Sequence, residues 1–252
     1  MTTGKKRANG EGSLRKRPDG RWEGRYTAGR DPVTGKAIYK NVLAKTQKEC
    51  KEKKEMKILP AEQIGAYLSA AEEHGVLPMF YLELTTGLRR GEITALLWTD
   101  LDVEARTLTV SKSAGRLKGE VRVTQPKTAN SVRTICLPKE TVDLLVREHE
   151  KHPSKPYMFP SPVTGRMYGP DCIGRLHKTL LKKAGITESL PFHGLRHTFA
   201  TLAIQQGVDV KTVSNILGHY SAGFTLDTYA HVTGDMRREA ADRMGGFIAQ
   251  AI

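Results

Sequence analysis

Two different sequence patterns meet near residue 60 of this 252-residue chain. Before that point, turn signals at Asp19-Gly20 and around residues 31–35 separate three short runs of alternating side chains. Asp-Gly between alternating runs is typical of a β-hairpin. After residue 60, apolar residues recur at helical spacing, as at Ile64, Tyr67 and Ala71. The sequence therefore predicts an α+β chain built from two parts.

The first part is predicted to be a small three-stranded sheet followed by one helix. We expect strands over residues 12–18, 21–28 and 36–43. The helix should begin at Thr46, because Glu49 follows three residues later as in a capping box. We assign residues 1–56 to this domain and residues 57–252 to the second.

Positive charge is concentrated in the first part. Residues 1–60 contain 17 Lys and Arg against 7 Asp and Glu, a net charge of +10, whereas residues 61–252 contain 23 against 20, a net charge of +3. A small basic module favours a polyanionic partner, and β-ribbons can enter a groove of DNA. The alternative is a basic face that meets only solvent. The side chains expected to bind DNA are Arg15, Arg17, Arg21, Arg25, Lys36 and Lys40.

Several classes of protein are excluded by what the sequence lacks. No apolar run approaches the roughly 20 residues that span a bilayer, and the first residues hold no apolar segment of a secretory signal. The three cysteines lie far apart, which predicts neither a disulfide framework nor a zinc site. His193 and His197 are spaced as metal ligands on a helix, but no nearby carboxylate completes a set. We expect a cytoplasmic setting and no metal.

The second part is predicted to be mainly helical, with a small antiparallel sheet inserted early. Apolar spacing predicts helices over residues 61–98 and near 139–150, 169–184, 194–206, 209–217 and 232–249. The expected strands are residues 108–110, 121–124 and 131–137.

Six side chains of the second part suit phosphoryl transfer without a metal. Such chemistry needs cations that stabilise charge on the phosphate, a proton donor for the leaving oxygen and a nucleophile that forms an ester. Each side chain alone has an ordinary explanation, as a salt bridge, a surface lysine or a buried aromatic. Arg89 is expected at a glycine-containing turn that opens a helix, and His219 at the exposed end of a helix that stops at Gly218. The set consists of Arg89, Lys127, His193, Arg196, His219 and Tyr229.

The segments around these side chains resemble the tyrosine recombinases of the phage integrase type. They read TGLRRGE, PKT, SVRTICLP, HGLRHTFAT and LGHYS, followed by Tyr229, in that order. The resemblance extends over about residues 58–250. Residues 10–56 resemble the arm-type DNA-binding domain of integrases from conjugative transposons.

The resemblance implies which side chains would hold the phosphate. Arg89 and Arg196 would clamp the scissile phosphate of double-stranded DNA, and His219 would donate a hydrogen bond to it. Glu92 would support Arg89 or the local helix rather than react.

The resemblance also implies the reacting groups. Tyr229 would attack the phosphate to form a 3′-phosphotyrosyl ester, His193 would assist the transfer of its proton, and Lys127 would protonate the 5′-hydroxyl that leaves. A phenol has an ordinary pKa near 10, so it needs nearby cations and a base to react at neutral pH. Relatives use no metal or other cofactor.

One part of the family pattern is missing from the chain. Such integrases carry arm-binding, core-binding and catalytic domains, but here the arm-like helix should end near Lys53 and the next helix should begin near Ala61. We therefore expect that the core-binding domain is absent, by deletion near Lys53-Lys54, and that recombination is impaired.

Other readings stay open beside the integrase. The chain could be a non-catalytic DNA-binding protein that competes with a full-length integrase at arm sites, or a type IB topoisomerase. For an integrase, the implied partners are DNA carrying attachment and arm sites, three further copies of the chain in a tetramer, and an excisionase. The implied location is the bacterial cytoplasm, on DNA.

Overall fold

The computed structural model describes residues 13–30, 37–46, 57–117, 120–124, 132–151, 153, 155–219, 222–229, 241–242, 244–247 and 249. The chain divides into two compact units, an N-terminal unit of residues 1–56 and a C-terminal unit of residues 57–252. Each unit is described separately below.

The N-terminal unit contains the expected three-stranded antiparallel sheet in the order β1-β2-β3. The hairpin between the first two strands closes at Gly20, where φ is +80°, a conformation that favours glycine. The turn expected around residues 31–35, and all of the helix expected from Thr46 except its first residue, lie outside the described residues. The strands are β1 (Ser13–Lys16), β2 (Trp22–Arg30) and β3 (Ala37–Ala44).

The strand register is known for several of the positions expected to bind DNA. In the backbone pairing, Arg15 is opposite Glu23, Arg25 is opposite Asn41 and Lys40 is opposite Tyr26. The side chains of Arg25 and Lys40 lie outside the described residues, so the single basic face stays a prediction.

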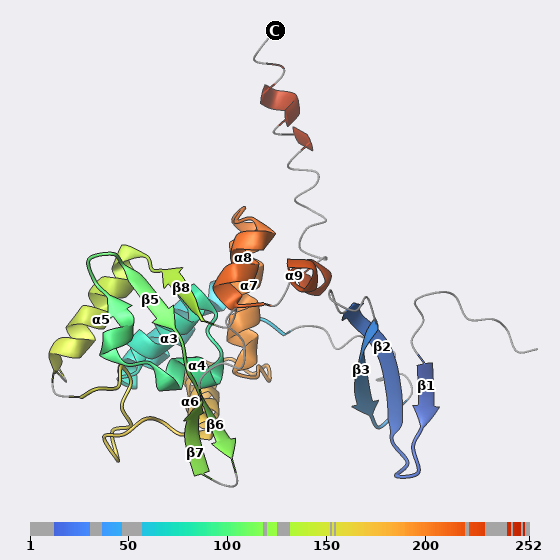
Figure 1. Cartoon of the computed structure of the whole chain (residues 1–252), viewed down its shortest axis with the longest axis horizontal. Helices are drawn as coiled ribbons and strands as arrows, with labels where there is room; N and C mark the ends of the chain where they lie inside the picture. Colours follow the sequence, from blue (N-terminus) through green and yellow to red (C-terminus); the bar gives the residue numbers. More distant parts are fainter. Residues whose placement is uncertain are drawn as a thin grey trace, which may run out of the picture. The chain divides into compact units, whose positions relative to one another are not determined.

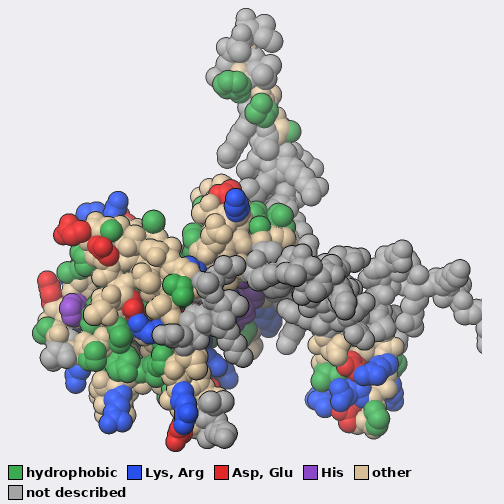
Figure 2. Space-filling view, viewed as in Figure 1, with side chains coloured by type: hydrophobic (Ala, Val, Ile, Leu, Met, Phe, Trp, Pro, Cys, Tyr) green, Lys and Arg blue, Asp and Glu red, His purple; other side chains and the backbone are tan. Residues whose placement is uncertain are grey.

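The described arginines of the N-terminal unit are engaged by carboxylates. Arg15 forms an ion pair of 2.6 Å with the buried Glu23, and Arg21 forms one of 2.7 Å with Asp19. Arg17 lies 3.5 Å from Asp19. Figure 2 shows basic and acidic side chains intermixed on the described surface of this unit. A phosphate would have to compete with these carboxylates, although exposed ion pairs are weak.

The C-terminal unit is mainly helical, as the sequence predicts (Figure 1). Residues 61–98, which were expected to be helical, contain three helices separated by turns at Gly75 and Gly87, where φ is +72° and +60°. None of the helices in the described ranges is long and apolar enough to cross a membrane. The helices are α2 (Ala61–Glu73), α3 (Leu77–Thr86), α4 (Arg90–Ala95), α5 (Lys139–Lys151), α6 (Pro170–Lys183), α7 (His193–Gln205), α8 (Val210–Leu217) and α9 (Ala222–Tyr229).

The expected small sheet is in fact two sheets. One has the strand order β4-β5-β8, and β6 and β7 form a separate two-stranded hairpin. The sequence did not predict β4 or β6, nor the helix α9. The strands are β4 (Leu101–Asp102), β5 (Thr107–Val110), β6 (Ser113–Leu117), β7 (Glu120–Thr124) and β8 (Arg133–Cys136).

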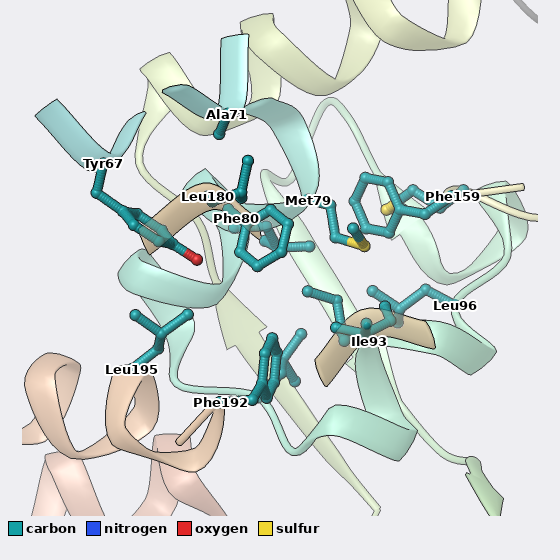
Figure 3. Close-up of a cluster of buried hydrophobic side chains, with 14 of the residues drawn as sticks. Tyr67, Ala71, Met79, Phe80, Ile93, Leu96, Phe159, Leu180, Phe192 and Leu195 are labelled. Atoms are coloured by element: carbon teal, nitrogen blue, oxygen red, sulfur yellow. The ribbon is translucent and has the colours of Figure 1, made fainter. Parts of the chain in front are cut away.

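The hydrophobic core of the C-terminal unit gathers buried side chains from α2, α3 and α7 and from the helices and strands packed around them. Phe80 packs edge-to-face against both Tyr67 and Phe192, with ring centroids 5.7 and 6.2 Å away (Figure 3). Tyr67 also contacts Nδ1 of the buried His177, whose Nε2 contacts the Leu190 carbonyl. This chain of polar contacts joins α2 and α6 to the segment that enters α7, and so supports the start of the helix that carries His193.

Candidate active site

The turn between α3 and α4 places Arg89 at a helix start. Gly87 ends α3 in the left-handed conformation, and its N–H donates to the Glu83 carbonyl. Arg89 then precedes the first residue of α4, and its N–H donates to Oε2 of Glu92 at 2.8 Å, as in a capping box. The expectation of an arginine at a glycine turn that opens a helix is met.

A second glycine turn ends α8 directly before His219. Gly218 is left-handed, and the N–H groups of Gly218 and His219 donate to the carbonyls of Asn215 and Ser214. This pairing is a Schellman motif, which leaves the later carbonyls of the helix without backbone donors.

Three arginines donate to those carbonyls, one after another. Arg133 Nε donates to Ile216 O at 2.7 Å, Arg196 Nη2 to Leu217 O at 2.7 Å and Arg89 Nη2 to Gly218 O at 3.0 Å. The donors come from β8, α7 and the start of α4. Cations at the carboxyl end of a helix are also favoured by its dipole. The three-carbonyl cluster of residues 216–218 therefore gathers three guanidinium groups beside His219.

Glu92 lies between two of these arginines. Its Oε1 accepts from Arg89 Nη1 at 2.8 Å, and both its oxygens accept from Arg133 at 3.0 and 2.8 Å. Burial alone would raise the pKa of Glu92, but the hydrogen bonds and charge of Arg133, together with Arg89, lower it to about 2. Glu92 is therefore an ionised support for arginines, in agreement with the role expected for it.

Arg196 lies deeper than Arg89. It is buried, and its Nη1 donates to the Gly87 carbonyl at 2.7 Å, so it joins the two glycine turns. Burial, with repulsion from Arg89, lowers the pKa of Arg196 to about 10, which still leaves it charged at neutral pH. The Arg89 side chain, by contrast, is 43% exposed and can meet a ligand from solvent.

The histidines of the site are held neutral. Burial, followed by repulsion from Arg196 and Arg89, lowers the pKa of His219 to about 3. His219 was expected at an exposed helix end, but it is half-buried and its Nδ1 contacts Thr225 Oγ1 at 2.7 Å. His193 is exposed, and desolvation with the charge of Arg196 lowers its pKa as well. Neutral imidazoles can accept or donate a proton, according to tautomer.

Tyr229 ends α9 and is almost fully buried, with 1% of its surface exposed. Its hydroxyl lies 2.8 Å from Nδ1 of His197, one turn along α7 from His193. Burial raises the pKa of Tyr229 to about 12, although the charge of Arg196 lowers it in part. Burial also lowers the pKa of His197 to about 4.

The structure brings together most of the predicted catalytic set. The described members Arg89, His193, Arg196 and His219 are close enough to influence one another's charge, and Tyr229 joins them through Arg196. Lys127 and Lys36 lie outside the described residues, as do the side chains of Arg25 and Lys40.

Sequence reasoning missed two residues of the site. His197 was considered only as a metal ligand, although its place one turn after His193 could have suggested a shared role. Arg133 was passed over inside a strand motif, and its contacts lie 41 and 83 residues away along the chain. Among the described residues, no group of three His, Cys, Asp or Glu side chains could hold a metal ion.

The comparisons with known proteins agree with this geometry. The phage integrase family matches residues 57–235. A tyrosine recombinase XerC-like protein of Caldanaerobacter subterraneus subsp. tengcongensis is 30% identical over 239 residues, which cover 85% of this chain and 59% of that protein. The ICEBs1 integrase of Bacillus subtilis is 32% identical, covering 76% of this chain and 55% of that integrase. This chain thus spans less than two thirds of the length of either relative.

Among solved structures, the Tn1549 transposon integrase bound to a circular intermediate DNA superposes with a TM-score of 0.67 at 25% identity. The match covers 79% of this chain and 70% of that one. The catalytic domain of the bacteriophage HP1 integrase, 21% identical with a TM-score of 0.52, shares the fold; 75% of this chain and 95% of that domain are covered. The chain therefore belongs to the phage integrase family of tyrosine recombinases and is similar to the integrases of conjugative transposons.

Proposed function

We propose that this chain is a site-specific DNA recombinase that cleaves and rejoins strands through a 3′-phosphotyrosyl ester at Tyr229. The observation that carries the proposal is that Arg89 and Arg196 both donate to carbonyls at the end of α8, and His219 follows directly after that helix end. Two guanidinium groups and an imidazole at one point suit a phosphodiester whose charge increases in the transition state.

The proposed step balances with the residues of the chain alone. The Tyr229 oxygen forms a bond to phosphorus while the bond from phosphorus to the 5′-oxygen breaks. The phenol proton passes to His193, and Lys127 supplies the proton that the 5′-oxygen takes up. The ester conserves the energy of the broken bond, so the reverse attack by a 5′-hydroxyl rejoins the strand without ATP.

The two units are proposed to bind different DNA sites. The N-terminal unit would bind arm sites through its basic side chains, and the C-terminal unit would bind the crossover site. Only 16 residues separate the end of β3 from the start of α2, which is too few for a helical core-binding domain. Because phosphate contacts supply much of the affinity for DNA, we expect weak binding at the crossover site and slow cleavage.

A suicide DNA substrate, nicked so that cleavage cannot reverse, tests the proposal. We expect a slowly accumulating covalent adduct that withstands denaturing gels and is absent in Tyr229→Phe. No adduct, with arm-site binding retained, would instead favour a non-catalytic competitor of a full-length integrase. Relaxation of supercoiled plasmid without strand exchange would favour a topoisomerase.

The proposal includes the assembly that the resemblance implies. Four copies would meet on paired crossover sites in the bacterial cytoplasm, and an excisionase would direct the reaction. Sedimentation of the chain with attachment-site DNA, with and without the excisionase candidate of the same element, tests this part separately from cleavage.

A further inference from the structure

Three arginines donate to the carbonyls of residues 216–218, and Arg133 is the one to which the resemblance gives no role. We propose that Arg133 is a positioning residue for strand cleavage, which holds His219 and Arg89 in place by joining Glu92 to the end of α8. This inference rests on the proposed function and names a further residue that the same site requires.

The contacts of Arg133 use almost the whole guanidinium group. Nη1 and Nη2 donate to the two oxygens of Glu92, while Nε donates to Ile216 O. Only 8% of the Arg133 side chain and 7% of the Glu92 side chain are exposed. Lysine could not reproduce this arrangement, because its ammonium lacks the planar fork that binds a carboxylate through two nitrogens.

The Arg133 side chain packs closely against the backbone at the end of α8. A Cβ atom at Gly218 would lie 2.9 Å from Arg133 Nη1 and 3.1 Å from its Cδ and Cζ. Glycine is thus required at position 218 for two reasons: the backbone there is left-handed, and the Arg133 side chain leaves no room for a Cβ atom. The guanidinium fills the space directly before His219.

The consequences of losing Arg133 follow from its two partners. Glu92 would keep its two contacts with Arg89, but each of its oxygens would lose the donor that Arg133 supplies, so Arg89 would be held less firmly. The Ile216 carbonyl would lose its donor, and the turn that carries His219 would be free to shift. A reacting group misplaced by about 1 Å can lose on the order of 100-fold in rate.

The first experiment measures single-turnover cleavage of the suicide substrate by Arg133→Lys and Arg133→Gln in the full chain. We expect the rate at saturating DNA to fall about 30- to 100-fold, while the dissociation constant for DNA changes by less than about threefold. Arg147→Gln is the matched control, because Arg147 is an exposed arginine of α5 whose side chain donates to the Asp143 carbonyl of the same helix. Weaker DNA binding with an unchanged rate at saturation would overturn the proposal.

The second experiment does not depend on activity. NMR titration of His219 in the same variants, assigned with His219→Gln, should show its pKa rising toward the ordinary value as the turn opens to water. Arg147→Gln should leave the pKa of His219 unchanged. If the wild-type chain forms no adduct, the proposed function fails, and this titration alone decides the role of Arg133. An unchanged His219 titration in both Arg133 variants would show that Arg133 does not position the turn.

Discussion

The hydroxyl of Tyr229 lies 2.8 Å from Nδ1 of His197, one helical turn beyond the His193 to which the resemblance assigns its proton. The pKa of Tyr229 is raised to about 12 and that of His197 is lowered to about 4, so both side chains are neutral at pH 7. The tyrosine is therefore a buried phenol that is hydrogen-bonded to His197 and not a prepared phenolate.

Removing either partner of this pair should cost stability, and removing both should cost less than the sum. His197→Phe leaves a buried hydroxyl without its partner, at a cost of about 1–3 kcal/mol, and Tyr229→Phe leaves the ring nitrogen unpaired. The double variant removes both polar groups, so we expect a coupling free energy of about 0.5–3 kcal/mol. Urea unfolding of the four proteins at pH 7 measures it. Strictly additive costs would show that the contact does not form in solution.

The predictability of the site depended on how local each contact is. Gly87 and Gly218 could be recognised as turn residues from the sequence, and they correctly placed Arg89 and His219 at helix ends. Arg133 could not be placed, because the carboxylate and carbonyl that it joins are far away in the chain. The burial of His219 was missed for the same reason, since Arg196 and Thr225 enclose it only in the folded unit.

The elements of the fold were likewise predictable where their own sequence specifies them and not where distant partners do. The helices with strong apolar spacing were predicted, whereas the short α9 and the strand β6 were not. The β6 sequence, Ser-Ala-Gly-Arg-Leu, has little strand character and is specified by its pairing with β7 along the hairpin. Short elements of this kind depend on their partners more than on their own composition.

The neutral histidines should make the protein less stable in mild acid. His177 is buried with its pKa lowered to about 4, mainly by burial, and the pKa values of His197 and His219 are also low. Below about pH 6.5 the unfolded chain binds protons that the folded chain does not bind until about pH 4, so the free energy of unfolding falls as pH falls through this window. His177 alone accounts for up to about 3 kcal/mol at pH 4.

Urea midpoints at pH 7, 6 and 5 measure this fall. His177→Gln should weaken the dependence, because the group that resists protonation is gone. A midpoint that stays constant between pH 6.5 and pH 5 would contradict the burial of these neutral rings.

Glu83 and Glu92 should respond to the same substitution in opposite ways. Glu83 is fully buried, neither carboxyl oxygen has a hydrogen-bond partner among the described residues, and burial raises its pKa well above 4.5 despite the charge of Arg196. As pH rises above 4.5 the unfolded chain loses this proton and the folded chain retains it, so stability falls. Glu83→Gln should therefore gain stability relative to wild type between pH 5 and pH 7, by about 1 kcal/mol or more.

Glu92→Gln should show the reverse sign. The pKa of Glu92 is held at about 2, so its ionised form contributes stability above pH 4.5 that is lost as pH falls toward 2. The variant should be less stable than wild type at pH 7, by about 3 kcal/mol, because Arg133 would lose a charged partner. If the stabilities of the two variants relative to wild type changed with pH in the same direction, Glu83 would be ionised and paired with Arg196.

Alanine substitutions at Gly87 and Gly75 distinguish the cost of backbone strain from the cost of close packing. Both follow a helix with φ between +60° and +72°, so alanine at either position incurs about 1–2 kcal/mol of left-handed strain. At Gly75 a Cβ atom would meet nothing within 4 Å, whereas at Gly87 it would lie 2.7 Å from Phe199 Cδ1 and 2.8 Å from Leu217 Cδ2. We expect Gly87→Ala to cost about 1–3 kcal/mol more than Gly75→Ala, through overpacking.

The two variants should also differ in chemistry. The Gly87 carbonyl accepts from Arg196, whose other nitrogen holds the Leu217 carbonyl beside His219. Relief of the clash would move Phe199 or the end of α8, so Gly87→Ala should lower the rate of adduct formation even where the protein remains folded. Gly75→Ala, at the far end of α3, should leave that rate unchanged. Equal unfolding costs and equal rates for the two variants would show that the α3 turn and the α8 end are not packed as tightly as these distances require.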